Sequence, residues 1–366
     1  MKIMLISPYR GVVGGISIWT SNILKYCDSQ SRVKVDLFDF SRTRTGQMIN
    51  NKLKRIFLAA YDYFHLTRKA VKHAKRFDGD VIHLCSSASY LLIRDYIILR
   101  ILKRKHKSKT CIHYHFGRIP ELAKQRNWEW KLLKKVSMLA DQVIVMDQLS
   151  CQTLLSHGIE NVTLLPNPLS DRVLDMIGSV KATREERVAL FAGHCIPTKG
   201  VFELVEACKG IPNIKLRLVG AISSEMQQKL VEVAGENSDW LEIKGQLSHE
   251  QTIYEMKSCD IFVLPTYTEG FPNVIIESMA CGCPIVASAV GAIPEMLEAE
   301  DDKHYGQMIQ PKNSEQIRVA IERYLNDQKF KVECANNAQS RVKERYNIQS
   351  VGLELVNIWE QVQGKK

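Results

Sequence analysis

Short apolar runs, rich in Val and Ile, recur along the chain and alternate with longer stretches of helical spacing. Uniformly apolar runs of about 4–8 residues are typical of strands buried on both faces of a parallel sheet. Strands that alternate with helices favour βαβ units, with helices on both faces of the sheet. The sequence therefore predicts an α/β protein of doubly wound parallel sheets. Strands are expected at residues 2–7, 33–38, 81–85, 110–114, 142–146, 162–165, 188–192, 214–219, 241–243, 261–264, 284–287 and 307–309.

The strand–helix pattern is interrupted once, near the middle of the chain. A length of 366 residues exceeds one ordinary domain, so two domains of roughly 150–200 residues are expected. The pattern restarts after Leu164-Leu165-Pro166-Asn167-Pro168, where two prolines precede a polar stretch at 170–187. We therefore expect one domain at residues 1–170 and a second at 171–345. Apolar residues at helical spacing in 347–362 predict a terminal amphipathic helix that must pack on another element.

Composition narrows the class of protein. A hydrophobic content of 45% and a charged content of 25% exclude a disordered or fibrous chain. No stretch reaches the roughly 18 apolar residues that span a bilayer, and the first apolar run is too short for a signal peptide. Without a secretion signal, the ten scattered cysteines are expected to be reduced core residues. We expect a cytoplasmic protein.

Charge is unevenly divided between the two halves. Residues 1–170 carry 28 Lys and Arg against 12 Asp and Glu, whereas residues 171–366 carry 22 against 28. Residues 51–77 and 96–109 combine basic side chains with aromatic and aliphatic ones, which suits peripheral attachment to an anionic membrane surface. A solvated helix face over an ordinary core is the alternative. No nucleic-acid partner is expected, because no recognised binding motif accompanies the charge.

The most informative segment is IFVLPTYTEGFPNVIIESMACGCPIVAS at 261–288. A helix is expected to begin near Pro272, since proline suits the first turn, and the N–H groups near Asn273 and Val274 can hold a phosphate. Glu269 precedes this helix and Glu277 lies about one turn inside it. Carboxylates accept paired hydrogen bonds from neighbouring hydroxyls. A carboxylate on either side of a phosphate-binding helix start therefore suits a sugar–diphosphate–ribose ligand. An isolated pair of this kind is more often a helix-start glutamate and a surface glutamate.

The stretch EGFPNVIIESMACGCPIVAS, followed by GAIPE, resembles the signature of the large retaining glycosyltransferase family four. The resemblance implies the GT-B fold, in which two Rossmann-like domains face each other across a cleft. Residues 1–170 would bind the acceptor, residues 171–345 the donor, and the helix in 346–366 would return to the first domain. By resemblance, Glu277 binds the ribose and Glu269 contacts the donor sugar as a catalytic residue. Gly270, Phe271, Pro272, Asn273 and Val274 complete this part of the donor site.

A second match is FAGHCIPTKG at 191–200. Lys199 occupies the family's lysine position on the donor diphosphate. His194 stands where the family usually has an arginine, which weakens the electrostatic clamp. Both residues are candidate donor contacts.

Two further candidates lie in the first domain. Gly14 and Gly15 follow the first strand, where glycines allow a backbone to approach a ligand closely and a helix start favours an anion. In the family this loop lies beside the donor phosphates and the acceptor, although a plain tight turn explains a Gly-Gly pair equally well. His115 follows the strand at 110–114, where ligand contacts of open α/β sheets collect. Family members similarly place a histidine near the transferred sugar, and a core or loop histidine is the alternative.

Neither of two motifs with metal-binding residue types predicts a metal site. Asp78-Gly79-Asp80 is expected in the turn before a strand, where Asp and Gly are ordinary turn formers. Cys281-Gly282-Cys283 has no second Cys or His pair at zinc spacing. We therefore expect no metal and no resident cofactor.

The resemblance implies a retaining, metal-independent glycosyltransferase. It would move a hexose or N-acetylhexosamine from a UDP- or GDP-linked sugar to a hydroxyl group. The expected acceptor is a lipid-linked saccharide of surface polysaccharide synthesis. The alternatives are a non-catalytic GT-B binding module, which the exchange at His194 favours, and a nucleotide-sugar epimerase, which has no support beyond the fold. The nucleotide base, the sugar, the linkage and the oligomeric state stay open.

Overall fold

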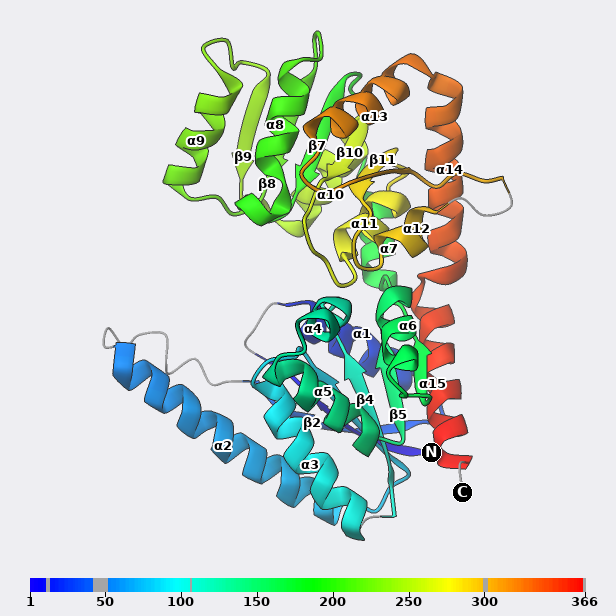
Figure 1. The fold of residues 1–366 in the computed structure, drawn as a ribbon. Helices are drawn as coiled ribbons and strands as arrows, with labels where there is room; N and C mark the ends of the chain where they lie inside the picture. Colours follow the sequence, from blue (N-terminus) through cyan, green and yellow to red (C-terminus); the bar gives the residue numbers. More distant parts are fainter. Residues whose placement is uncertain (11–13, 42–51, 106, 299–301, 365–366) are drawn as a thin grey trace. The chain divides into compact units, whose positions relative to one another are not determined.

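The chain divides into two compact units. The computed structural model describes residues 1–10, 14–41, 52–105, 107–298 and 302–364, without the side chains of 52–60, 104 and 105. Unit 1 consists of Met1–Pro168 with Ile348–Lys366, and unit 2 of Leu169–Asn347. The chain changes unit after residues 168 and 347, where the sequence analysis placed boundaries at 170 and 345. Each unit contains a six-stranded sheet with flanking helices (Figure 1). The predicted α/β fold is confirmed.

The sheet of unit 1 is parallel and has the strand order β2-β1-β3-β4-β5-β6. Its strands are β1 (Lys2–Ser7), β2 (Lys34–Asp39), β3 (Val81–Ser86), β4 (Lys109–Tyr114), β5 (Gln142–Val145) and β6 (Val162–Leu164). The helices are α1 (Gly15–Asp28), α2 (Lys52–Arg76), α3 (Leu91–Lys105), α4 (Ile119–Gln125), α5 (Trp128–Leu139), α6 (Gln148–Ser156) and the terminal α15 (Ile348–Gly364).

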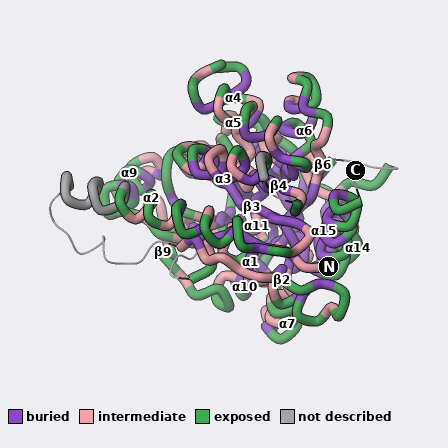
Figure 2. The backbone as a smooth tube through the Cα atoms, turned by 90° about the horizontal axis from the view of Figure 1, so that it is seen from below, coloured by how far each residue is buried: buried purple, intermediate pink, exposed green. Residues whose placement is uncertain are grey.

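Helices cover both faces of the unit 1 sheet. Successive side chains of a strand point to opposite faces, so Ile82 and Ile112 pack in the core with α2 to α6. Val81 and Cys111, their neighbours along the strands, pack instead with α1 and α15. β3 is buried along its whole length (Figure 2). Burial on both faces explains why these strands read as uniformly apolar runs.

Unit 2 repeats this architecture with the strand order β12-β11-β10-β7-β8-β9, again parallel. Its strands are β7 (Val188–Ala192), β8 (Lys215–Val219), β9 (Leu241–Gly245), β10 (Ile261–Leu264), β11 (Ile285–Ser288) and β12 (Gln307–Ile309). The helices are α7 (Asp171–Ser179), the short 3₁₀ helix η2 (Pro197–Lys199), α8 (Val201–Lys209), α9 (Ser224–Ala234), α10 (His249–Ser258), α11 (Asn273–Ala280), α12 (Ile293–Leu297), α13 (Ser314–Asn326) and α14 (Gln328–Arg345).

Each sheet has one point at which the direction of strand order reverses. In unit 2 the reversal lies between β7 and β10, and in unit 1 between β1 and β3. Right-handed crossovers place the helices on opposite faces on either side of the reversal, which leaves a crevice at the carboxyl ends of the two strands. Ligand sites are therefore expected in the loops that follow these four strands.

The terminal helix α15 packs within unit 1 on α1, β3 and β4 (red in Figure 1). Its buried residues include Val351, Leu355 and Trp359. The indole Nε1 of Trp359 donates a hydrogen bond of 3.0 Å to Nδ1 of His83 on β3. Apolar packing and a buried hydrogen bond thus attach the last segment of the chain to the sheet of unit 1.

Gly352 is the residue of α15 that allows this helix to approach α1. A Cβ atom there would lie 2.6 Å from the ring of Tyr26. We expect Gly352→Ala to destabilise unit 1 by about 1–3 kcal/mol through overpacking. The measurement is urea unfolding followed by hydrogen exchange of the β3 and β4 amides. Gly364→Ala in the same helix is the matched control, since a Cβ there meets nothing within 4 Å. Equal effects of the two substitutions would contradict this packing account.

Candidate functional site

The turn after β7 lies directly against the turn after β10. Gly200, which ends η2, has a φ of 70°, and a Cβ atom there would lie 2.0 Å from the carbonyl oxygen of Pro265. Only glycine combines this backbone conformation with so close an approach. The N–H of Tyr267 also donates to the carbonyl of Thr198 at 2.9 Å. The two loops at the reversal point of unit 2 are therefore held together by backbone contacts.

This contact brings together two of the residues that the sequence singled out. Nζ of Lys199 donates to Oε1 of Glu269, and their side chains are 25% and 15% exposed. Each group neutralises the other in a partly buried setting. An anionic ligand that binds Lys199 must therefore share the ammonium group with Glu269 or displace it.

The helix α11 begins one residue later than the sequence analysis expected. Pro272 is the residue before the helix, because its ψ of 104° is extended, and Asn273 is the first helical residue. The first backbone N–H groups of a helix have no acceptor within the helix itself, and those of Asn273 and Val274 belong to this turn. Phe271, just before it, is buried. The geometry is that of a helix start opening at the carboxyl end of β10.

The loop after β11 supports the Glu269–Gly270 turn from the other side. The N–H of Ala292 donates to the carbonyl of Gly270 at 2.9 Å. Gly291 has a φ of 57°, and a Cβ atom there would lie 2.3 Å from the carbonyl oxygen of Glu269. The sequence contained this residue within GAIPE but did not show its role, which is to let two loops meet at backbone distance.

Glu277 pairs with a histidine that sequence reasoning missed. His249, the first residue of α10, places Nε2 at 3.2 Å from Oε1 of Glu277. The Glu277 carboxylate raises the pKa of His249 by hydrogen bonding to the imidazolium, although burial opposes the shift. The two residues are 28 positions apart, and no motif joins them, so only the fold reveals the pair.

His194 lies in the loop after β7 and is exposed. In the part of the chain that the structure describes, no hydrogen bond or ion pair joins its side chain to Lys199 or Glu269. Its proposed contact with a donor therefore stays a prediction.

The glycine pair of unit 1 begins α1, at the carboxyl end of β1. Gly14 precedes the helix with an extended backbone, and its N–H donates to Oγ of Ser17 at 3.1 Å. A Cβ atom at Gly14 or Gly15 would meet nothing within 4 Å among the described atoms. Packing within the chain therefore does not explain glycine at these positions. Close approach of a ligand stays a prediction, and residues 11–13 of the loop lie outside the described residues.

His115 follows β4 and belongs to a buried aromatic group on the α1 side of the sheet. Its N–H donates to the carbonyl of Ser86 at 2.8 Å. Its ring centroid lies 3.9 Å from that of His113 and 4.9 Å from that of Trp19. We call His83, His113 and His115, with Trp19 and Trp359, the histidine cluster.

The histidines of this cluster are uncharged at neutral pH. Burial lowers the pKa of His83 and of His115 to about 3, and the pKa of His113 lies well below its usual range for the same reason. Among the described atoms, Nε2 of His115 is buried and has no hydrogen-bond partner. His115 therefore carries no positive charge at neutral pH, and its Nε2 is enclosed by the protein.

The two motifs rejected as metal sites have structural roles. Oδ2 of Asp80 accepts a hydrogen bond of 2.7 Å from the N–H of Lys2, and Asp78 pairs with the ammonium group of the same lysine. Cys281 and Cys283 are free and buried, as are the other eight cysteines. Within the described ranges, no three His, Cys, Asp or Glu side chains are grouped as ligands for a metal ion.

The histidine cluster predicts how unit 1 responds to acid. Because the folded pKa of His115 is about 3 and the unfolded value is about 6.5, only the unfolded chain binds this proton at intermediate pH. The free energy of unfolding therefore has its full value above about pH 6.5. Below that pH it decreases by up to about 1.4 kcal/mol per pH unit for each histidine. We expect His115→Gln to reduce this slope in urea unfolding of unit 1. The exposed control His65→Gln should leave it unchanged, and an unaltered slope in His115→Gln would contradict the assignment.

Two doubly wound units, each with a six-stranded parallel sheet, are the architecture of the GT-B class of folds. Comparison with known proteins agrees with this class. Residues 176–341, which lie in unit 2, match the family model of glycosyl transferases group 1.

Two relatives are named as glycosyltransferases, and a solved structure has a similar fold. The chain is 29% identical over 166 residues to the Bacillus subtilis protein TuaC, which is named for teichuronic acid biosynthesis; this covers 44% of the chain and 39% of TuaC. It is 22% identical to the glycosyltransferase MJ1178 of Methanocaldococcus jannaschii, over 94% of both chains. The structure of Anabaena HepE in complex with UDP superposes with a TM-score of 0.74 at 19% identity, over 99% of this chain and all of HepE.

Proposed function

We propose that this chain is a retaining glycosyltransferase of surface polysaccharide synthesis. It transfers a hexose or N-acetylhexosamine from a UDP- or GDP-linked sugar to a hydroxyl of a lipid-linked saccharide. The observation that carries the proposal is the Lys199–Glu269 pair beside the start of α11, at the reversal point of the unit 2 sheet. A cation, a helix start and a carboxylate meet there, and these are the groups that a nucleoside-diphosphate sugar requires.

The donor would bind in an order that follows the chemistry of the residues. The diphosphate takes the ammonium of Lys199 and the first N–H groups of α11, with His194 as a further contact. The ribose hydroxyls bind Glu277, one turn into the helix. Release of Lys199 towards the diphosphate frees Glu269 to accept hydrogen bonds from hydroxyls of the sugar. The ammonium group of Lys199 and the start of α11 balance the negative charge of the diphosphate, so the proposed scheme needs no metal ion.

The proposed transfer is a displacement on one face of the sugar. The acceptor oxygen forms a bond to the anomeric carbon on the side from which the diphosphate oxygen leaves, and the departing diphosphate takes the acceptor proton. Lys199 and the α11 start stabilise the charge that develops on the leaving group, so the site acts mainly by electrostatic preorganisation. His115, which is uncharged at neutral pH, would hold a sugar hydroxyl rather than exchange a proton.

Unit 1 would hold the acceptor and meet the membrane. Gly14 and Gly15 leave open space where β1 ends. The exposed side of α2 carries Tyr61 and Phe64, 60% and 63% exposed, followed at helical spacing by Arg68 and other basic residues. Such a face suits an anionic lipid surface. No helix in the described ranges is long and apolar enough to cross a bilayer. The name of TuaC, which refers to teichuronic acid biosynthesis, supports a role in polysaccharide synthesis.

Substitution of the two glutamates is expected to impair different steps, nucleotide binding for Glu277 and sugar transfer for Glu269. Glu277→Gln removes the charged partner of the ribose, so UDP or GDP should bind about 10–100-fold more weakly, for a hydrogen bond to a charged group worth roughly 1.5–3 kcal/mol. Glu269→Gln should keep or strengthen nucleotide binding, because Lys199 no longer pairs with a carboxylate, but it should abolish turnover of the nucleotide sugar. Calorimetric titration measures the first effect, and release of nucleotide from the sugar donor measures the second.

The exposed Glu225→Gln on α9 is the control for both substitutions, since Glu225 forms a surface ion pair with Lys229. Equal nucleotide affinity in all three variants would remove Glu277 from the donor site. Nucleotide binding with no transfer to any acceptor by the unmodified protein would favour the non-catalytic binding module.

The membrane surface is tested on the described part of α2. Arg68, Lys72 and Lys75 are exposed and follow Phe64 at helical spacing. At about 1 kcal/mol per basic residue, the triple substitution to Glu should weaken binding to phosphatidylglycerol vesicles by roughly 100-fold or more at low salt. Lys52, Lys54 and Arg55 at the start of the helix have side chains outside the described residues.

The control for this experiment is the triple substitution of Lys303, Lys329 and Lys343 to Glu, which makes the same change of charge on exposed residues of unit 2. It should bind the vesicles almost as well as the unmodified protein. Equal losses would mean that net charge alone drives attachment, and no binding by the unmodified protein would contradict the membrane proposal.

A further inference from the structure

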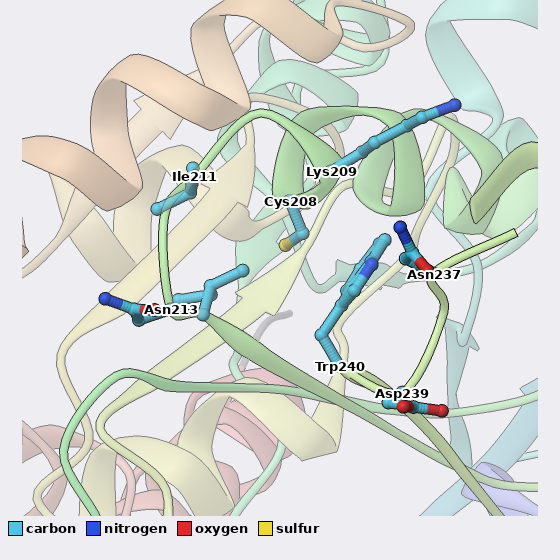
Figure 3. A pocket seen from close by; sticks show the side chains of 8 residues that line it. Cys208, Lys209, Ile211, Asn213, Asn237, Asp239 and Trp240 are labelled. Carbon is cyan, nitrogen blue, oxygen red and sulfur yellow. The ribbon is translucent and has the colours of Figure 1, made fainter. Parts of the chain in front are cut away.

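A hollow of about 310 Å³ lies at the edge of unit 2, between the loop that follows α8 and the loop that precedes β9. Cys208, Ile211 and Ile214 are the buried part of its lining. Figure 3 shows Asn213 coming from the first loop, and Asn237, Asp239 and Trp240 from the second. Its volume is at the lower end of the range of small-molecule sites, which is about 300–1,000 Å³. The hollow is therefore large enough for a small cyclic ligand.

Trp240 is the aromatic wall of this hollow, and it differs from the other tryptophans. Another aromatic ring lies next to each of the other four tryptophans, which are Trp19, Trp128, Trp130 and Trp359. Trp240 is partly exposed. In the part of the chain that the structure describes, no ring, cation or hydrogen-bond partner engages its indole. A large apolar ring and an N–H donor are thus both available to a ligand.

The rim supplies hydrogen-bonding groups of both kinds. Asn213, Asn237 and Asp239 are exposed, and no described residue hydrogen-bonds to their side chains. An amide offers two donors and an acceptor, and a carboxylate accepts from paired hydroxyls. The lining carries one carboxylate, Asp239, and one ammonium group, Lys209, so its formal charge is zero; the Lys209 ammonium donates to the carbonyl of Val233 at 3.0 Å. The site therefore selects a neutral ligand with many hydroxyls, rather than a phosphate.

We propose that the Trp240 hollow binds a neutral saccharide unit. The apolar face of a pyranose ring lies on the indole, and its hydroxyls bind the two asparagines and Asp239. This arrangement of one aromatic surface and a few convergent polar groups is the usual composition of a specific small-ligand site.

The site is separate from the candidate donor site. Its loops lead into the amino ends of β8 and β9, whereas Lys199 and Glu269 follow the carboxyl ends of β7 and β10. All six strands are parallel, so the two sites lie at opposite ends of the strands. A strand of five residues separates these ends by about 16 Å. A second hollow of about 290 Å³ shares Lys209 and is lined further by Glu206, Ser314, Glu315 and Arg318. Two adjoining hollows provide room for consecutive units of an oligosaccharide.

The test uses the full chain labelled with 5-fluorotryptophan, in which each of the five tryptophans gives its own fluorine signal. Trp240→Phe assigns the signal of interest, and Trp128 serves as the exposed reference. The probes are maltohexaose, cellohexaose and chitotetraose, with UDP and inorganic phosphate as non-saccharide ligands. We expect at least one saccharide to shift the Trp240 signal alone in a saturable manner.

Two further variants keep the indole of Trp240, so the test does not depend on whether Trp240→Phe disturbs the local structure. Asn237→Ala and Asp239→Ala should each weaken that saccharide roughly threefold to tenfold, as loss of one hydrogen bond predicts, and leave UDP affinity unchanged. No saccharide shift of the Trp240 signal, or a shift caused by UDP or phosphate instead, would overturn the proposal. Because UDP affinity is measured in the same samples, failure of the donor site and failure of the Trp240 site are distinguishable.

Discussion

The close approach of two loops at the reversal point of the unit 2 sheet is the constraint on which the candidate donor site depends. Gly200 has no room for a side chain against the carbonyl of Pro265, and Gly291 has none against that of Glu269. These contacts hold the loops after β7, β10 and β11 at backbone distance. As a result Lys199 meets Glu269, and both lie beside the start of α11. The charged residues supply the chemistry, but the glycines set the geometry.

The two units present different electrostatics to a ligand. In unit 2 the candidate residues are charged but paired, Lys199 with Glu269 and Glu277 with His249. A donor must exchange these pairs for its own contacts, which favours a ligand that has both an anionic group and hydroxyls. In unit 1 burial keeps His115 and its neighbours uncharged. A sugar held there would meet hydrogen-bonding groups without a competing charge.

Inner strands such as Lys2–Ser7 and Ile261–Leu264 could be predicted because they are buried on both faces. These two and two further strands have the expected bounds. Lys199, Glu269 and Glu277 could be singled out because their residue types follow strand ends in a recognisable motif. His249 could not, since it meets Glu277 only through folding. The hydrogen bond between His83 and Trp359 joins residues that are 276 positions apart in the sequence. Such contacts depend on tertiary packing, which local patterns do not encode.

The central claim is that the reversal point of unit 2 binds a nucleoside diphosphate through Lys199. The most direct measurement is the thermal stability of the unmodified protein and of Lys199→Ala with UDP, GDP and ADP in EDTA. A ligand at about 100 times its dissociation constant stabilises the protein by about 2.7 kcal/mol. The account predicts a clear rise with one nucleotide in the unmodified protein and a much smaller one in Lys199→Ala. Equal rises in both proteins, or none with any nucleotide, would contradict it.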